Sequence, residues 1–276
     1  MNPLISRLQP GATPGLWIDG TDYCARLFGA DAPWLDVTAG VAWLRKAQDL
    51  LRSDVLELDA MRIVDAACAA RLELRTAMAA RSRGGYALKT LLADESLRAL
   101  LVEWVVALRS ALPNAPLCLR LPSPRATIGH AWQLAHGAPP EDAADEDMID
   151  AAALHVADFL RGFSSAGLDA LLLDEGSGPM PAADTLALYQ SVLNVAAGYQ
   201  WAVGLACPQG TGAADLPAAF AFAVADAPLT VPTVLRLPAS VWDGGDAGPA
   251  APLRHVRIPE PTQPEQVLRQ LGQLRG

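Results

Sequence analysis

The stretch 149–178, IDAAALHVADFLRGFSSAGLDALLLDEGSG, decides the fold class. Apolar residues recur along its first half at the spacing of one helical stripe, at Ile149, Ala153, Val156, Leu160 and Phe163. Gly167 ends this helix, as glycine does where the chain takes a left-handed turn. The run 168–173 is mostly apolar on both alternating faces, which is typical of a parallel strand covered on both sides.

Strand-like and helix-like segments alternate along the rest of the chain. Further strands are expected at 14–19, 54–59, 116–121, 199–206, 230–237 and 254–258. The pattern predicts an α/β fold, a (β/α)8 TIM-barrel-like domain formed by residues 1–276, with a doubly wound open sheet as the alternative. The eighth strand lies at 219–224 or at 86–91, or the barrel is irregular. Segments 22–33 and 125–140 are expected to be loops, the second with a helical turn.

The composition restricts the partners of the chain. Hydrophobic residues make up 51% and charged residues 18%, so a substantial core is expected. A net charge of −9 leaves no basic face for nucleic acid and disfavours an anionic membrane surface. The sequence has no apolar run long enough to span a bilayer, no secretory signal and no CxxC pair among its four cysteines. We therefore expect a cytoplasmic chain with reduced thiols that binds a small molecule.

Acids and arginines at the predicted strand ends form the candidate site, because the C-terminal strand ends of parallel barrels carry the chemistry. Catalytic roles are expected for Asp174, Glu175 and Asp59, and ligand contacts for Asp19, Arg120, Cys207, Arg236 and His130, with His255 as a further candidate. Strand alternation points only one of Asp174 and Glu175 into the barrel, and Asp174 is favoured. Cys207 is more often a buried filler than a nucleophile, and Arg120 either clamps a carboxylate or pairs with a neighbouring strand end.

The order of these pieces resembles the barrel shared by uroporphyrinogen decarboxylase and cobalamin-independent methionine synthase. Three segments carry the resemblance: LCLRLPSPRATIGHAW at 117–132, AGLDALLLDEG at 166–176 and WAVGLACP at 201–208. In the methionine synthase branch the last two correspond to an Asp-Glu-Pro strand end and a His-x-Cys zinc pair. Here Gly176 replaces the proline and Leu205 stands in place of the zinc-binding histidine. The resemblance implies a barrel with a ligand pocket, and we expect neither a metal nor a cofactor.

The resemblance implies a methyltransferase-like or related enzyme that acts on a small acidic or methyl-donor ligand without zinc. Two alternatives stay open, a non-catalytic or partner-dependent binding protein on the same barrel and a decarboxylase-type lyase using Asp59 or Asp174. The arginine-rich N-terminal signature of the decarboxylase is missing, and the net charge of −9 suits a polyanionic tetrapyrrole poorly. A homodimer or a partner subunit that completes the site also stays open.

Overall fold

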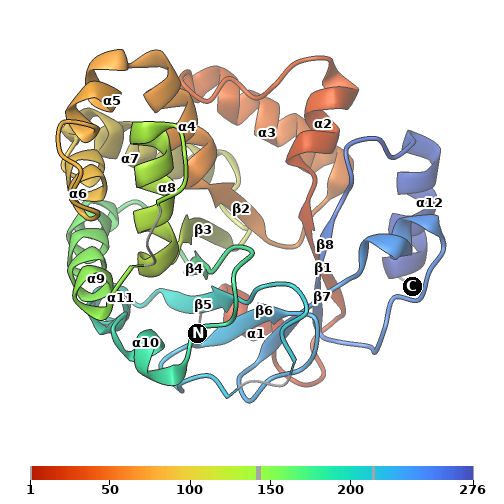
Figure 1. Cartoon of the computed structure of the whole chain (residues 1–276). Helices are drawn as coiled ribbons and strands as arrows, with labels where there is room; N and C mark the ends of the chain where they lie inside the picture. Colours follow the sequence, from red (N-terminus) through yellow and green to blue (C-terminus); the bar gives the residue numbers. More distant parts are fainter. Residues whose placement is uncertain (1, 141–143, 213–214, 276) are drawn as a thin grey trace.

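The computed structural model describes residues 2–140, 144–212 and 215–275, and eight parallel strands form its centre (Figure 1). The strands are β1 (Gly15–Asp19), β2 (Leu56–Asp59), β3 (Leu117–Pro122), β4 (Ala170–Asp174), β5 (Ala202–Ala206), β6 (Phe222–Ala225), β7 (Thr233–Arg236) and β8 (Leu253–Arg257). Their order in the sheet is β1-β8-β7-β6-β5-β4-β3-β2, so the sheet curls into a nearly closed barrel. The predicted TIM-barrel fold is confirmed. That residues 1–276 form one domain stays a prediction, which limited proteolysis would test.

Helices cover the outside of the barrel, mainly along its first five strands (Figure 1). They are α1 (Pro3–Arg7), α2 (Thr21–Phe28), α3 (Val37–Leu51), α4 (Ala60–Ala70), α5 (Leu72–Met78), α6 (Tyr86–Leu92), α7 (Glu95–Ala111), α8 (Pro124–His136), α9 (Glu146–Leu160), η1 (Arg161–Phe163), α10 (Ala183–Ala187), α11 (Gln190–Gly198), η2 (Ala239–Asp243) and α12 (Pro264–Arg275). The described residues between β5 and β7 contain no helix, so that part of the barrel is irregular. Within the described ranges, no helix is long and apolar enough to cross a membrane.

The stretch that decides the fold forms α9, η1 and β4, as predicted. Gly167 joins them with a backbone φ of +87°, a left-handed conformation in which a side chain would be strained. Leu171 and Leu173 point outward into the core under the helices, whereas Leu172 points into the barrel. All three are buried, because β4 pairs with β3 on one side and β5 on the other.

Side chains complete the barrel at the seam between β1 and β2. The Asp54 backbone N–H donates to the Leu16 carbonyl at 2.7 Å, and Asp54 Oδ2 accepts from the Leu16 N–H at 2.8 Å. Ser53 Oγ accepts from the Ile18 N–H at 2.9 Å. These bonds hold β2 beside β1, so the inward-facing residues of β8, β1 and β2 share one wall of the barrel.

The interior of the barrel is apolar toward the N-terminal ends of the strands. Leu4 of α1 and the nearby Leu8 close this end and pack with inward-facing residues of the strands. Phe222 fills the middle beside Gly204, where a Cβ atom would lie only 2.2 Å from the phenyl ring. Because these side chains fill the lower barrel, a ligand can enter only from the C-terminal end.

The structure resolves the open eighth strand and corrects two expected loops. The eighth strand is β6, which overlaps the proposed segment 219–224, while segment 86–91 lies in helix α6. Segment 22–33 contains α2, and segment 125–140 is mostly α8 rather than a loop with one turn. Ser123 caps α8 by accepting from the Ala126 N–H, and Pro124 occupies its first turn. Serine followed by proline is typical of a helix start, a signal that the loop prediction for 125–140 did not use.

Candidate active site

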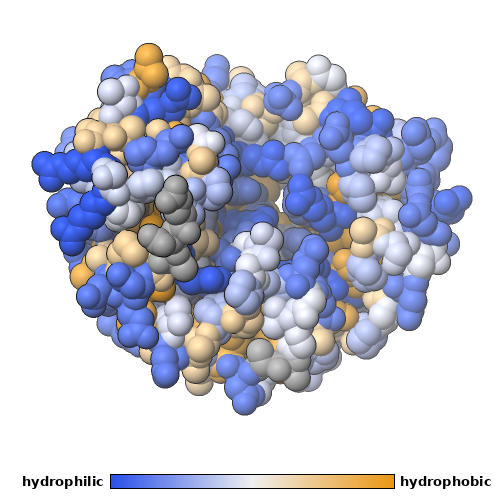
Figure 2. All heavy atoms as spheres, in the orientation of Figure 1, coloured by the Kyte–Doolittle hydropathy of each residue, from blue (hydrophilic) through white to orange (hydrophobic). Residues whose placement is uncertain are grey.

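The C-terminal strand ends surround a cleft of about 640 Å³. Figure 2 shows a hollow over the centre of the barrel, with mostly hydrophilic residues around it. The lining residues include the predicted Asp19, Arg120, Asp174, Cys207, Arg236 and His255, together with Gln209 and Arg257. Six of the nine candidate residues thus line one cleft at the C-terminal strand ends, and their roles there stay a prediction.

Arg120 on β3 joins carboxylates from two neighbouring strands. Its Nε donates to Asp174 Oδ2 at 3.0 Å and its Nη2 contacts the same oxygen, while Nη1 lies 3.3 Å from Glu57 Oε1. Asp174 also accepts the Gly176 N–H at 2.9 Å. Arg120 thus pairs with carboxylates on the two neighbouring strands, and these contacts already use the donors that would bind an anionic ligand.

Glu57 is the functional candidate that sequence reasoning missed. It lies in the middle of β2, its side chain is only 10% exposed, and its Oε2 has no hydrogen-bond partner within the described part of the chain. Burial, reinforced by the charges of Asp19 and Asp59, raises the pKa of Glu57 to about 7 despite the neighbouring Arg120. A signal was present in the sequence: in DVLELD, Glu57 alternates with two leucines and therefore faces the same side as Asp59.

His255 and Trp17 add two more unpartnered polar atoms to the same wall. The residues are paired across β1 and β8, and their rings meet edge to face with centroids 5.9 Å apart. Neither His255 Nδ1 nor Trp17 Nε1 has a hydrogen-bond partner among residues 2–140, 144–212 and 215–275. Burial lowers the pKa of His255 to about 4, so its imidazole is neutral at pH 7. Buried polar atoms are normally paired, so this wall is suited to contact a ligand.

Asp19 and Asp59 lie at the strand ends on either side of the seam. Asp19 lines the cleft and lies 3.6 Å from Arg257 Nε. Asp59 caps α4, since its Oδ1 accepts the Met61 N–H at 2.9 Å. Burial raises the pKa of Asp59 above its ordinary value. Asp59 is thus a helix cap that also adds negative charge near Glu57.

Arg236 is held by hydrogen bonds to neighbouring residues, and Cys207 is buried. Arg236 Nη1 pairs with Asp226 at 2.9 Å, and Nη2 donates to the Cys207 carbonyl at 2.6 Å. Burial raises the pKa of the Cys207 thiol to about 11, which keeps it protonated at neutral pH. Arg236 therefore clamps the ends of β5, β6 and β7 together. Asp226 escaped prediction because the strand before it, β6, was not identified with certainty.

Three predicted site residues do not line the cleft: Asp59, which caps α4, and also Glu175 and His130. Glu175 is buried behind β4, where Arg125 Nη2 donates to it at 2.8 Å and the Tyr189 hydroxyl at 2.7 Å. His130 lies on α8, and its Nε2 is 2.8 Å from Asp65 Oδ1. The structure brings neither Glu175 nor His130 together with Asp174 and Arg120.

A metal site requires several His, Cys, Asp or Glu side chains that converge on one point. Nowhere in the described ranges do three His, Cys, Asp or Glu side chains gather in an arrangement that could hold a metal ion. The expectation that the chain binds no zinc stays a prediction, which elemental analysis of chelator-free protein would test.

Comparison with known proteins supports the barrel fold. No protein-family model matches the sequence, and no curated protein does. Among solved structures the chain is similar to a methyltransferase from Methanosarcina mazei, with a TM-score of 0.57 and 13% sequence identity. The likeness covers 99% of this chain and 97% of that one. What the two share is the fold. The similarity therefore supports the barrel fold over the aligned residues.

Proposed function

We propose that this chain is a methyltransferase-like enzyme whose active site is the cleft at the barrel mouth, with Glu57 as its proton-transfer group. The observation that carries the proposal is the state of Glu57. Its carboxyl lies largely buried beside the cleft, one oxygen has no hydrogen-bond partner among the described residues, and its pKa is about 7. Groups that exchange protons in catalysis work best with a pKa near the working pH. Strong pKa perturbation in a cleft is also typical of functional sites.

The charges at the mouth favour a positively charged methyl donor over an acid. Five carboxyl groups lie in or beside the mouth with its three arginines. Asp19 and Asp174 line the cleft, and Glu57, Asp59 and Asp226 lie next to the lining residues. Arg120, Arg236 and Arg257 each already contact at least one carboxylate, so an added carboxylate would meet few free donors. A sulfonium or quaternary ammonium group, by contrast, gains from the surplus of negative charge. We therefore favour the methyl-donor form of the substrate over the acidic form.

Glu57 would act on the acceptor of the methyl group. A methyl group that leaves a cationic donor as CH₃⁺ takes its positive charge to the acceptor and leaves a neutral product. If the acceptor is a thiol, alcohol or amine, its proton must leave as the new bond to carbon forms. The Glu57 carboxylate can take this proton, while neutral His255 and Trp17 offer hydrogen bonds that orient the substrate.

Binding and turnover can be tested with simple ions of matched shape. Tetramethylammonium should raise the melting temperature of the full chain, because ligand binding stabilises the native state, whereas the equally bulky anion pivalate should not. Asp19→Asn should remove this shift, and Asp158→Asn, which changes an exposed carboxylate on α9, should not. Stabilisation by pivalate alone would contradict the proposed charge preference.

Turnover is tested with ¹³C-methyl trimethylsulfonium and a thiol acceptor, followed by NMR. Glu57→Gln should slow methyl transfer by about 10²-fold or more, the usual contribution of a general base. Glu73→Gln, a change at an exposed residue on α5, is the matched control. An unchanged rate in Glu57→Gln would exclude Glu57 from the chemistry.

A non-catalytic binding protein on the same barrel is the second candidate. It is favoured by the state of Cys207 and Arg236, since the thiol is buried and protonated and the guanidinium is held by backbone carbonyls and Asp226. Binding of tetramethylammonium without methyl transfer to any acceptor would support it. A decarboxylase-type lyase is less well supported, because the mouth arginines already face carboxylates and Asp59 caps a helix.

A further inference from the structure

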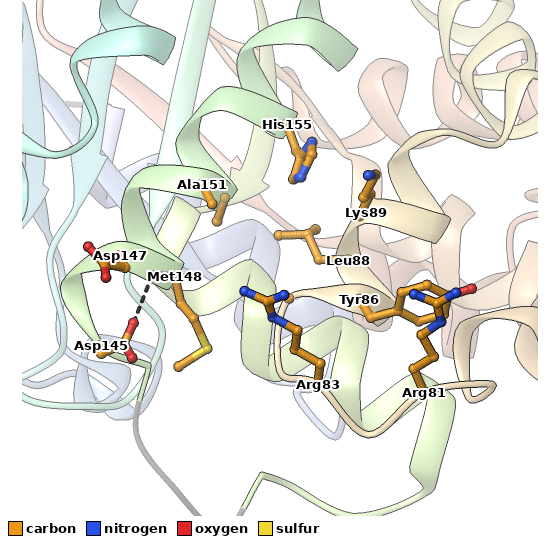
Figure 3. Close-up of a pocket in the computed structure, with 12 residues that line it drawn as sticks. Arg81, Arg83, Tyr86, Leu88, Lys89, Asp145, Asp147, Met148, Ala151 and His155 are labelled. Atoms are coloured by element: carbon orange, nitrogen blue, oxygen red, sulfur yellow. Dashed lines mark hydrogen bonds between the residues drawn. The ribbon is translucent and has the colours of Figure 1, made fainter.

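A second pocket, of about 530 Å³, lies on the outside of the barrel between the segment 81–89 and helix α9 (Figure 3). Its floor is apolar and includes the buried Leu88 and Ala152 together with Met148 and Ala151. A Cβ atom on Gly84 would lie 2.8 Å from Met148 Sδ, so the loop packs tightly against α9 at this point. The two walls are therefore in contact, and the pocket is part of the folded structure.

Three cations stand on one side of this pocket. Arg81, Arg83 and Lys89 line it, and none of them makes an ion pair with another residue that the structure describes. The Arg81 guanidinium packs on the Tyr86 ring, 5.0 Å from its centroid, which fixes its direction. In Figure 3 the Arg83 side chain extends from its loop toward α9, and Asp145 and Asp147 lie at the far end of the pocket. A cluster of three cations with no ion-pair partner among the described residues is unexpected in a chain with a net charge of −9.

His155 faces the cations from the opposite wall of the pocket. It lies on α9 and approaches Lys89 across the pocket (Figure 3). Burial first, and then the charge of Lys89, lowers its pKa, while Asp158 acts weakly in the opposite direction. At pH 7 the imidazole is neutral and can still donate one hydrogen bond. An anion beside Lys89 would offset the repulsion and raise this pKa.

We propose that this pocket binds a small organic phosphate, with the phosphoryl group held by Arg81, Arg83 and Lys89 and the apolar body on Leu88 and Met148. Arginine and lysine donors together match a dianion, and charge-assisted hydrogen bonds to phosphate are strong. The pocket volume is within the range of small-molecule sites. No residue of this pocket lines the cleft at the barrel mouth, so the site is separate from the proposed active site.

Three probes distinguish the contributions of the cations and of the apolar floor to binding: phenyl phosphate, inorganic phosphate and phenol. The readout is the NMR titration of the His155 imidazole, assigned by its loss in His155→Gln. We expect phenyl phosphate to raise the pKa of His155 and to bind more tightly than inorganic phosphate, with no effect of phenol. Arg83→Gln and Lys89→Gln should each weaken phenyl phosphate binding by about tenfold, as the loss of one charge-assisted hydrogen bond predicts.

Two control variants separate this site from general charge effects. Arg161→Gln removes a cation whose side chain is 64% exposed and does not line the pocket, and it should leave the affinity unchanged. Asp174→Asn alters the barrel mouth and should also leave it unchanged. An unmoved His155 titration, an equal loss of affinity in Arg161→Gln, or equal binding of inorganic and phenyl phosphate would each overturn the proposal.

Discussion

Two glutamates of this barrel, the largely buried Glu57 and the fully buried Glu175, each face an arginine, yet their surroundings differ. Glu175 receives hydrogen bonds from Arg125 at 2.8 and 3.1 Å and from the Tyr189 hydroxyl at 2.7 Å, so both of its oxygens are paired. Glu57 has one contact of 3.3 Å with Arg120, and its second oxygen has no partner within the described ranges. The hydrogen bonds of Glu175 are therefore satisfied without a ligand, whereas those of Glu57 within the described ranges are not.

This difference separates a structural cluster from a candidate catalytic one. A fully paired buried network fixes one packing arrangement, here between β4, α8 and the α10–α11 junction. A buried carboxyl without full pairing costs free energy in the empty protein, and such costs are concentrated at functional sites. Position on a strand or at its end does not show which of the two glutamates is functional. The hydrogen-bond partners do.

The largest expected effect is on stability, at the Glu175 cluster. Arg125→Leu leaves Glu175 as an unpaired buried charge, which should lower the free energy of unfolding by about 3–5 kcal/mol. Urea denaturation of the variant measures this. Arg161→Leu, at a mostly exposed arginine, should change stability by less than about 0.5 kcal/mol. A loss below about 1 kcal/mol in Arg125→Leu would mean that the cluster is not a structural one.

The pH dependence of stability should identify Glu57. Its pKa is about 7 in the folded chain and about 4.5 ordinarily, so its contribution to stability is complete below pH 4.5 and is lost as the pH rises through 7. His255, with a folded pKa of about 4, has the opposite slope between pH 4 and 6.5. Wild type should therefore lose roughly 3 kcal/mol relative to Glu57→Gln between pH 4.5 and 8.

Chemical denaturation of both proteins across this pH range is the measurement. Because His255 is present in both, its contribution cancels when the two curves are subtracted. Parallel curves for wild type and Glu57→Gln would show that Glu57 ionises normally.

A smaller effect is expected at the third member of the Glu175 cluster. Tyr189→Phe removes the 2.7 Å hydrogen bond to Glu175 but keeps the buried ring, and should cost about 1.5–3 kcal/mol. Burial and the Glu175 carboxylate raise the pKa of Tyr189, so the loss should be the same at pH 7 and pH 9. Thermal unfolding at both values would check this, and a loss found only at pH 9 would contradict it.

The smallest effect is expected at His130, which was predicted for the mouth. The structure pairs it with the half-exposed Asp65 on the outer surface. His130→Gln should therefore change stability by less than about 1 kcal/mol and leave ligand binding at the mouth unchanged. A loss of tetramethylammonium binding in this variant would mean that α8 reaches the cleft when a ligand is present.

Much of this fold could be predicted because the signals are local. The apolar run of β4, the glycine before it and the acids after it predict a parallel strand with a polar end. The rule that strand ends converge then predicted Asp19, Arg120 and Asp174 as neighbours. The two glutamates could not be ranked in this way. Which hydrogen bonds a carboxylate makes depends on residues 50 or more positions away, such as Arg125 for Glu175 and Arg120 for Glu57.

The most direct test of this account is the titration of the Glu57 carboxyl by ¹³C NMR, with the resonance assigned through Glu57→Gln. We predict that the carboxyl titrates with a pKa of about 7 and that saturating tetramethylammonium, which favours the carboxylate, lowers this value. A pKa near the ordinary value of 4.5, unchanged by the cation, would contradict the claim that the barrel mouth holds a proton-transfer group.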